Sequence, residues 1–192
     1  MDYQQTRRVR LFFGFTLLEL LVVFSLIVIV ASFAFPYFGQ LLQGSYAEAG
    51  RAQLLHTIQL ARSEALIRGQ PISLCKSSNQ ITCGGDWQQG QIVFVDEQQN
   101  GIIQRREQIL SVFQATMNNA TLYWRAFPRH QDYLQFLPDG TTQAENGSFW
   151  YCSSRAVHPA WAVMVSKSGR AREVYPNAVG LIVDGRGVPL RC

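Results

Sequence analysis

The chain has 192 residues and a mass of 21.7 kDa, enough for one ordinary domain and an appendage. Charged residues make up 16% of the chain against about 25% in typical soluble domains, and 47% of the residues are apolar. The formal net charge is +4, and 17 residues are basic. This composition excludes a disordered chain, a multidomain enzyme, a coiled-coil rod and a polytopic membrane protein.

An apolar segment covers residues 15–38, and Glu19 is its single ionisable residue. As a helix it would extend about 36 Å, more than the roughly 30 Å hydrocarbon core of a bilayer. Arg7, Arg8 and Arg10 precede the segment, and the positive-inside rule keeps that end in the cytoplasm. The pattern predicts one transmembrane helix with the rest of the chain exported. The alternatives are an ordinary signal anchor or a cleaved secretory signal, and the length fits the latter poorly.

The carboxylate of Glu19 sets this segment apart from an ordinary anchor, because a charge in hydrocarbon is costly and usually has a partner. No basic residue within the segment can neutralise it. A free α-amino group of a neighbouring copy could do so. That group would exist if the chain were cut just before the segment.

The motif GFTLLE, which ends at Glu19 and follows a short basic leader, resembles the signal of type IV pilins and type II secretion pseudopilins. The resemblance implies that a prepilin peptidase cleaves after Gly14 and that the new N-terminal residue, Phe15, is methylated. It also implies that Glu19 pairs with the amino terminus of a neighbouring subunit during filament assembly. Pro36 falls where many pilins carry a helix-loosening proline.

The helix is expected to continue over residues 40–68, where only Gly44 and Gly50 interrupt it. Small and apolar residues recur at spacings of three and four and form a stripe expected to pack on a sheet: Ala52, Leu55, Ile58, Ala61 and Ala65. Gly69 followed by Pro71 predicts the end of the helix.

The pattern then changes to short strands separated by turns. Strands are expected at residues 91–95, 101–103, 108–113, 121–124, 133–137, 149–152, 161–166, 172–175 and 181–183. The first two flank Asn100-Gly101 and would form a hairpin. The expected fold class is α+β and pilin-like: a long N-terminal helix, transmembrane and then amphipathic, packed on an antiparallel β-sheet domain. The expected parts are the leader 1–14, the transmembrane helix 15–38, its amphipathic continuation 39–70 and a periplasmic or extracellular β-domain 71–192.

Four cysteines agree with export into an oxidising compartment: Cys75, Cys83, Cys152 and Cys192. Three connectivities are open. The short loop between Cys75 and Cys83 is the simplest pair, and it leaves Cys152 to join Cys192. A zinc site is the alternative, but the chain has no Cys-x-x-Cys pair and its histidines stand isolated. We therefore favour disulfides and expect neither a metal nor a cofactor.

Residues 72–96 are similar to the GspH/FimT minor pseudopilins, which carry a similar cysteine pair. They also carry a W-x-x-G-hydrophobic-F-x-D stretch, which runs here from Trp87 to Asp96. The resemblance implies other major and minor pilins as partners.

The sequence does not predict an enzyme, because it has no nucleophile elbow, phosphate-binding glycine loop or metal-ligand spacing. Asp96 and Glu97, adjacent in an expected strand, would point to opposite faces, which is poor geometry for an acid–base pair. His130 and His158 lie beside prolines in expected loops and are expected to be solvated. The four tryptophans, at positions 87, 124, 150 and 161, are expected to be core or strand-packing residues.

Positive charge is concentrated in residues 155–192, which have a net charge of +4, while residues 15–154 have −2. Arg170 and Arg172 lie two residues apart on an expected strand, so both would project from one face. Guanidinium groups roughly 7 Å apart can bridge neighbouring phosphates of a nucleic acid, in a sequence-independent and salt-sensitive way. The alternative is a solvated edge strand whose arginines serve solubility.

Residues 169–172 read GRAR and resemble the G-R-x-R motif of FimT-type minor pilins that bind DNA during natural transformation. The resemblance implies that Arg170 and Arg172, next to Gly169, contact the phosphate backbone, with Lys167 and Arg186 as weaker candidates. The chain is thus expected to be an inner-membrane minor pilin with a periplasmic C-terminal domain, which enters a pilus at the cell surface and binds double-stranded DNA. We expect no small-molecule substrate. The alternatives are a structural minor pilin that primes pilus assembly and the equivalent pseudopilin of a type II secretion system.

Overall fold

The computed structural model describes residues 16–192 except 106–107, 115–116, 118–119, 129, 144–145 and 155, and it describes only the backbone of residues 33–41 and 43. The chain divides into two compact units, one ending at Gln43 and the other covering Gly44–Cys192. Among the side chains described, no helical stretch is both long and apolar enough to cross a membrane.

Helix α1 (Leu17–Arg68) forms the N-terminal part of the described chain. The backbone amide of Glu19 donates a hydrogen bond to the Thr16 hydroxyl at 3.2 Å, which caps the first turn. The helix continues through Gly44 and Gly50, as the sequence predicts. It ends before Gly69, whose φ of +62° is the left-handed conformation typical of a helix C-terminus, so the predicted end is confirmed.

The buried stripe of α1 within the unit Gly44–Cys192 follows Leu54, Ile58, Ala61 and Ala65, which are at most 1% exposed. The predicted stripe is right from Ile58 onward and wrong at Ala52, while Leu55 packs against the core without being fully buried. Ala52 is exposed and Leu55 only half-buried. Two adjacent leucines fit the spacing nearly equally well, and packing against the sheets selects Leu54.

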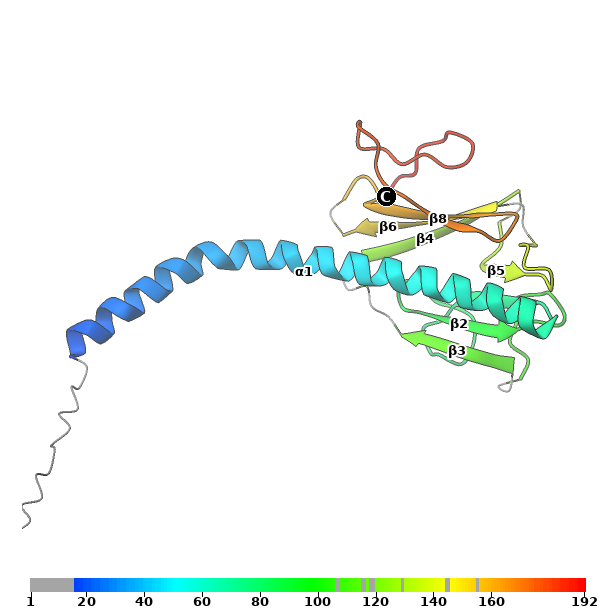
Figure 1. Ribbon diagram of the computed structural model, residues 1–192, viewed down its shortest axis with the longest axis horizontal. Helices are drawn as coiled ribbons and strands as arrows, with labels where there is room; N and C mark the ends of the chain where they lie inside the picture. The colour runs from blue at the N-terminus through cyan, green and yellow to red at the C-terminus, as the bar shows by residue number, and fades with distance from the viewer. Residues whose placement is uncertain are drawn as a thin grey trace, which may run out of the picture. The chain divides into compact units, whose positions relative to one another are not determined.

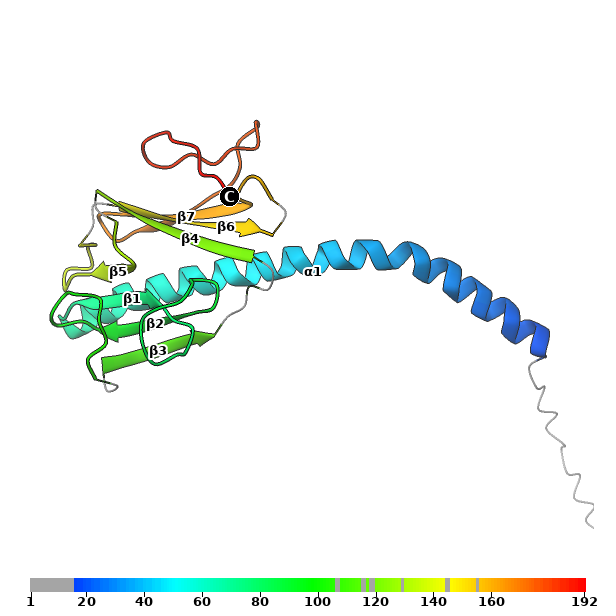
Figure 2. The same cartoon turned by 180° about the vertical axis from the view of Figure 1, so that it is seen from behind.

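Eight strands in the described residues form two antiparallel sheets of four strands each (Figures 1 and 2). One sheet has the order β3-β2-β1-β5 and comprises β1 (Ile72–Lys76), β2 (Gly90–Val95), β3 (Ile109–Gln114) and β5 (Tyr133–Phe136). The other has the order β4-β6-β7-β8 and comprises β4 (Ala120–Phe127), β6 (Asn146–Ser153), β7 (Trp161–Ser166) and β8 (Ala171–Val174).

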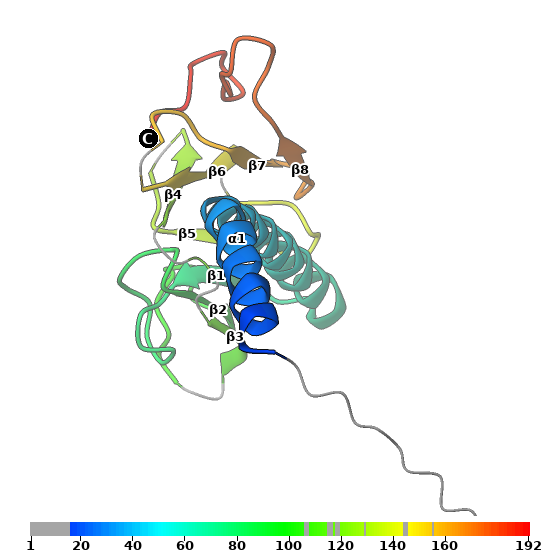
Figure 3. The same cartoon turned by 90° about the vertical axis from the view of Figure 1, so that its left-hand side faces the viewer.

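A single large core joins the second half of α1 to the inner faces of both sheets (Figure 3). Phe149 of β6 lies at its centre, where its ring stacks on Trp124 at 4.2 Å and meets Trp87 edge-on at 4.9 Å. Each such side chain contributes about 2–3 kcal/mol by burial. Trp87, Trp124 and Trp161 are buried as the sequence predicts, whereas Trp150 lies on the outer face and is half-buried.

Two predicted strands are absent from the described residues. Residues 101–103 do not pair with β2, because β3 takes that place, so the predicted hairpin is wrong. Asp96 follows β2 instead of lying within it, and its buried carboxylate accepts hydrogen bonds from the backbone amides of Asn100 and Gly101. These bonds give the backbone amides of Asn100 and Gly101 hydrogen-bond acceptors, so the two amides need no partner strand. Residues 181–183 contribute only an isolated bridge between Val183 and Pro189.

Residues 175–192, here called the C-terminal arm, lie over the outer face of the sheet β4-β6-β7-β8 (Figure 1). Ile182 and Leu190 of the arm are buried against Ala162 and Met164 of β7. The indole of Trp150 donates a hydrogen bond to the Arg191 carbonyl at 2.9 Å. The arm is therefore packed on the sheet and covers part of its outer face.

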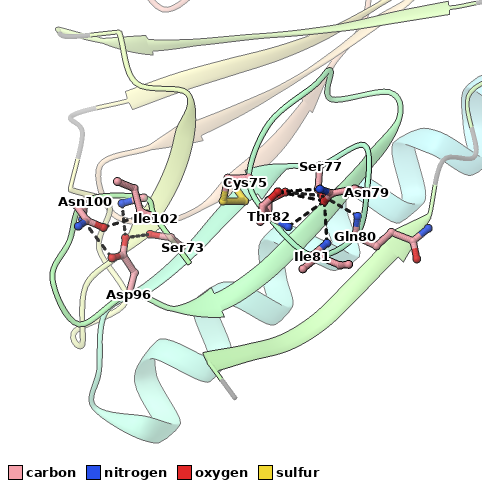
Figure 4. The surroundings of a disulfide bond; sticks show 12 residues. Ser73, Cys75, Ser77, Asn79, Gln80, Ile81, Thr82, Asp96, Asn100 and Ile102 are labelled. Carbon is pink, nitrogen blue, oxygen red and sulfur yellow. Dashed lines mark hydrogen bonds between the residues drawn. A yellow bond between two sulfur atoms is a disulfide. The ribbon is translucent and has the colours of Figure 1, made fainter. Parts of the chain in front are cut away.

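The structure contains the two disulfides that the sequence favours. Cys75 bonds to Cys83, and Cys152 bonds to Cys192, with a Cα–Cα distance of 5.6 Å in each pair. The first closes the loop after β1 (Figure 4), in which Asn79 accepts hydrogen bonds from the backbone amides of residues 81 and 82. The second fixes the end of the C-terminal arm to β6.

Candidate nucleic-acid interface

A groove of about 530 Å³ lies on the part of the outer sheet face that the C-terminal arm leaves open. Strands β4, β6, β7 and β8 contribute to its floor. The turn between β7 and β8 forms one wall, and residues 184–186 of the arm form the other. Four arginines and one carboxylate line the groove: Arg125, Arg170, Arg172, Arg186 and Asp184. The groove is therefore lined by a net charge of +3.

Arg170 and Arg172 come from the β7–β8 turn and from β8, and both are exposed. They line the same groove as predicted, although Arg170 precedes β8 instead of lying on it. Arg172 pairs in register with Met164, whose sulfur lies 3.5 Å from Nη2 of Arg172. Neither arginine forms an ion pair with a carboxylate of the described residues. Both guanidinium groups are thus available to an external anion.

Gly169 lies in the turn that carries Arg170 and leads into Arg172 on β8. Its φ is +74°, and a Cβ atom placed there would lie 2.0 Å from the carbonyl oxygen of Gly140. The same carbonyl accepts a hydrogen bond from Nε of Arg62 on α1 at 3.1 Å. Only glycine fits this conformation and this approach without strain, so the residue fixes the turn against its neighbours. Lys167 lies exposed in the same turn and does not line the groove.

Asp184 organises the opposite wall. Its carboxylate lies 2.8 Å from Nη2 of Arg125 and 3.4 Å from Nη2 of Arg186, and its side chain is 7% exposed. Burial alone would raise the pKa of Asp184. Hydrogen bonds from the backbone amides of Val188 and Arg186, together with the charges of Arg125 and Arg186, outweigh burial and lower this pKa below its ordinary value. Asp184 is therefore ionised in the folded protein at neutral pH.

Arg125 and Arg186 also contact aromatic rings. The guanidinium of Arg186 lies 4.7 Å from the ring centre of Phe127, and that of Arg125 lies 5.6 Å from the ring centre of Trp150. Sequence reasoning missed Arg125, because the strand expected at 121–124 stops one residue short of it. In the structure β4 extends to Phe127, and its alternation turns Arg125 outward between the buried Trp124 and Ala126.

The groove lining contains none of the other residues that the sequence singled out. Gly14 and Phe15 fall outside the described residues. Glu19 lies exposed in the first turn of α1, and Pro36 has helical backbone. His130 is exposed, with Nε2 3.6 Å from a carboxylate oxygen of Asp132. No group of three or more metal-binding side chains occurs in the described part of the chain.

The family model described as Type II transport protein GspH matches residues 51–169, more than half of the chain. The chain therefore belongs to the GspH/FimT family of type IV minor pilins and type II secretion pseudopilins, a family of structural filament subunits. The match ends at Gly169, so Arg170, Arg172 and the C-terminal arm lie beyond it. Arg125 is the one groove arginine within the matched region.

Several solved structures are similar to the chain at low sequence identity. The chain is similar to the type IV minor pilin FimU of Pseudomonas aeruginosa, with 20% identity, a TM-score of 0.50, and coverage of 66% of this chain and 91% of FimU. GspH of E. coli is 15% identical, with a TM-score of 0.44 and coverage of 68% of this chain and 89% of the E. coli protein. EpsH, the minor pseudopilin of the Vibrio cholerae type 2 secretion system, is 12% identical, with a TM-score of 0.43 and coverage of 67% of this chain and 95% of EpsH. No curated protein matches the chain. The likeness to FimU confirms the predicted pilin-like packing of a helix on antiparallel strands.

Proposed function

We propose that the protein is a minor pilin of a type IV pilus that binds extracellular double-stranded DNA through the groove, for DNA uptake in natural transformation. The observation that carries this proposal is the pair of exposed arginines, Arg170 and Arg172, which face the groove without a carboxylate partner in the described residues. Unpaired guanidinium groups bind phosphate oxygens with two parallel hydrogen bonds. Such contacts carry no sequence information, so binding would be non-specific.

The arrangement of the groove also supports a polyanion more than a small metabolite. It is open, and its arginines come from three separate segments: β4, the turn with β8, and the C-terminal arm. The serines at positions 148, 166 and 168 add hydroxyl groups suited to phosphate and sugar oxygens. We propose no catalytic role and no cofactor for the protein.

The proposed filament role rests on family membership and on the N-terminal sequence. We propose that prepilin peptidase cleaves after Gly14, that Phe15 is then methylated, and that residues 15–38 anchor the chain in the inner membrane. Glu19 would pair with the amino terminus of a neighbouring pilin, and Pro36 would loosen the helix within the filament. The C-terminal domain would face the periplasm and later the cell surface, in contact with major and minor pilins.

The experiment that tests DNA binding uses the unit Gly44–Cys192, which contains the large core and both disulfides. We expect it to retard a random-sequence 30-bp duplex in gels, with equal affinity for unrelated sequences and weaker binding at higher salt. With two phosphates neutralised, the plot of log K against log salt should have a slope of about −1.8. A folded domain that leaves the duplex unretarded at low salt would contradict the proposal. It would favour a subunit that primes assembly or a type II secretion pseudopilin, with the arginines facing acidic protein partners.

A further inference from the structure

The four arginines of the groove fall into two pairs with different surroundings. Arg125 and Arg186 each contact the carboxylate of Asp184 and the face of an aromatic ring. Arg170 and Arg172 contact neither a carboxylate nor an aromatic ring within the described residues. Arg172 lies near the sulfur of Met164. Two of the four arginines in the groove therefore already share one carboxylate inside the protein.

The two carboxylate oxygens of Asp184 have separate roles. Oδ1 accepts hydrogen bonds from the backbone amides of Arg186 and Val188, both at 2.9 Å, and so stabilises the tight turn of the arm. Oδ2 faces the groove and accepts hydrogen bonds from Arg125 and Arg186. It thus occupies the position that a phosphate oxygen would take between these two arginines.

The C-terminal arm holds Asp184 in this position. The Cys152–Cys192 disulfide fixes the end of the arm, and Ile182 and Leu190 pack on β7 on either side of Asp184 in sequence. The carboxylate therefore stays in the groove without a ligand. A ligand that needs Arg125 or Arg186 must compete with the buried carboxylate of Asp184, which the arm already holds against these two exposed or half-buried side chains.

We propose that Asp184 is an internal counter-ion that divides the groove into an open phosphate site at Arg170 and Arg172 and an occupied site at Arg125 and Arg186. This inference rests on the proposed anion-binding function of the groove. A phosphate chain binds first at the open site. It reaches the second pair only by displacing Asp184, so Asp184 limits the affinity of the groove.

The test measures binding of inorganic tripolyphosphate to the unit Gly44–Cys192 by calorimetry. Replacing Asp184 with asparagine removes the competing charge but keeps an amide oxygen for the backbone bonds of the arm. We expect D184N to bind about tenfold more tightly than the unaltered protein, because two charge-assisted contacts become available. Adding R125Q to D184N should remove most of that gain. Equal or weaker binding by D184N with an intact arm, judged by the amide NMR signals of Gly187 and Val188, overturns the proposal.

If D184N loosens the arm, a second comparison tests whether Asp184 competes with phosphate for Arg125. R125Q and R170Q each remove one charge from the same groove. We expect R170Q to weaken tripolyphosphate binding about tenfold and R125Q to weaken it about twofold at most, because Arg125 is already paired. Equal losses, or no binding of tripolyphosphate by any variant, would overturn the inference.

The same proteins titrated with the 30-bp duplex separate this inference from the proposed function. If the order of tripolyphosphate affinities holds and the unaltered protein leaves DNA unbound, the inference stands and the DNA proposal fails. If the unaltered protein binds DNA and D184N brings no gain with either ligand, the DNA proposal stands and Asp184 has only a structural role in the arm.

Discussion

Replacing both Arg170 and Arg172 with glutamine is expected to remove most DNA binding without unfolding the domain. Each arginine is exposed, and neither forms an ion pair within the described residues, so the fold loses little when they change. Two lost phosphate contacts should weaken binding by about a hundredfold at low salt. They should also flatten the slope of log K against log salt by about 1.8. Fluorescence anisotropy with a labelled duplex at several salt concentrations measures both quantities.

The matched control is a variant with the same loss of charge outside the groove. Arg68 and Arg105 are exposed and do not line the groove. Changing both to glutamine lowers the net charge by two, as in the first variant. The comparison therefore separates the effect of where the arginines lie from the effect of total charge. We expect DNA affinity within about threefold of the unaltered protein. If both double variants lost affinity equally, binding would reflect overall charge, and the groove would have no special part in it.

Gly169→Ala is expected to be strongly destabilising, because Gly169 is buried in a tight turn. An alanine would need a positive φ, and its Cβ would collide with the carbonyl oxygen of Gly140, which also accepts the hydrogen bond from Arg62. We expect the free energy of unfolding to fall by roughly 3 kcal/mol, from strain and overpacking together. DNA binding should weaken as well, because the turn carries Arg170 and leads into Arg172. Chemical denaturation and the duplex titration check the two effects.

Gly180→Ala separates the cost of a positive φ from the cost of overpacking. Gly180 also has a positive φ, +76°, but a Cβ there would meet no atom within 4 Å. Its replacement should cost only the conformational penalty, about 1 kcal/mol, and should leave the β7–β8 turn in place. Similar losses of stability at the two positions would contradict the close packing of Gly169 on Gly140.

The sequence is most informative where a feature depends on neighbouring residues. The end of α1 follows from Gly69 and Pro71, and the short spacing between Arg170 and Arg172 brings both to the same groove. Burial of Trp124 and Trp161 follows from their large apolar area. Such local preferences do not require knowledge of which segments meet in space.

The groove itself could not be predicted, because three distant segments build it. Arg125 belongs to β4, which lies at the opposite edge of the sheet from β8. Asp184 reaches the groove only because the C-terminal arm folds back over the sheet and is fixed by the Cys152–Cys192 disulfide. The hairpin predicted at Asn100-Gly101, which the structure does not form, has a similar explanation. Asn100-Gly101 is a strong local turn signal, but the bonds to the buried Asp96 and the pairing of β2 with β3 decide the actual path.

The most direct measurement of the central claim is an NMR titration that follows the arginine side-chain Nε–Hε signals of the unit Gly44–Cys192 as duplex DNA is added. We expect the signals of Arg170 and Arg172 to shift progressively and to return when salt is raised. The signal of Arg51, which is paired with Glu48 and Glu173 away from the groove, should stay in place. Shifts confined to arginines outside the groove, or none at all with a folded domain, would contradict the claim that this groove binds DNA.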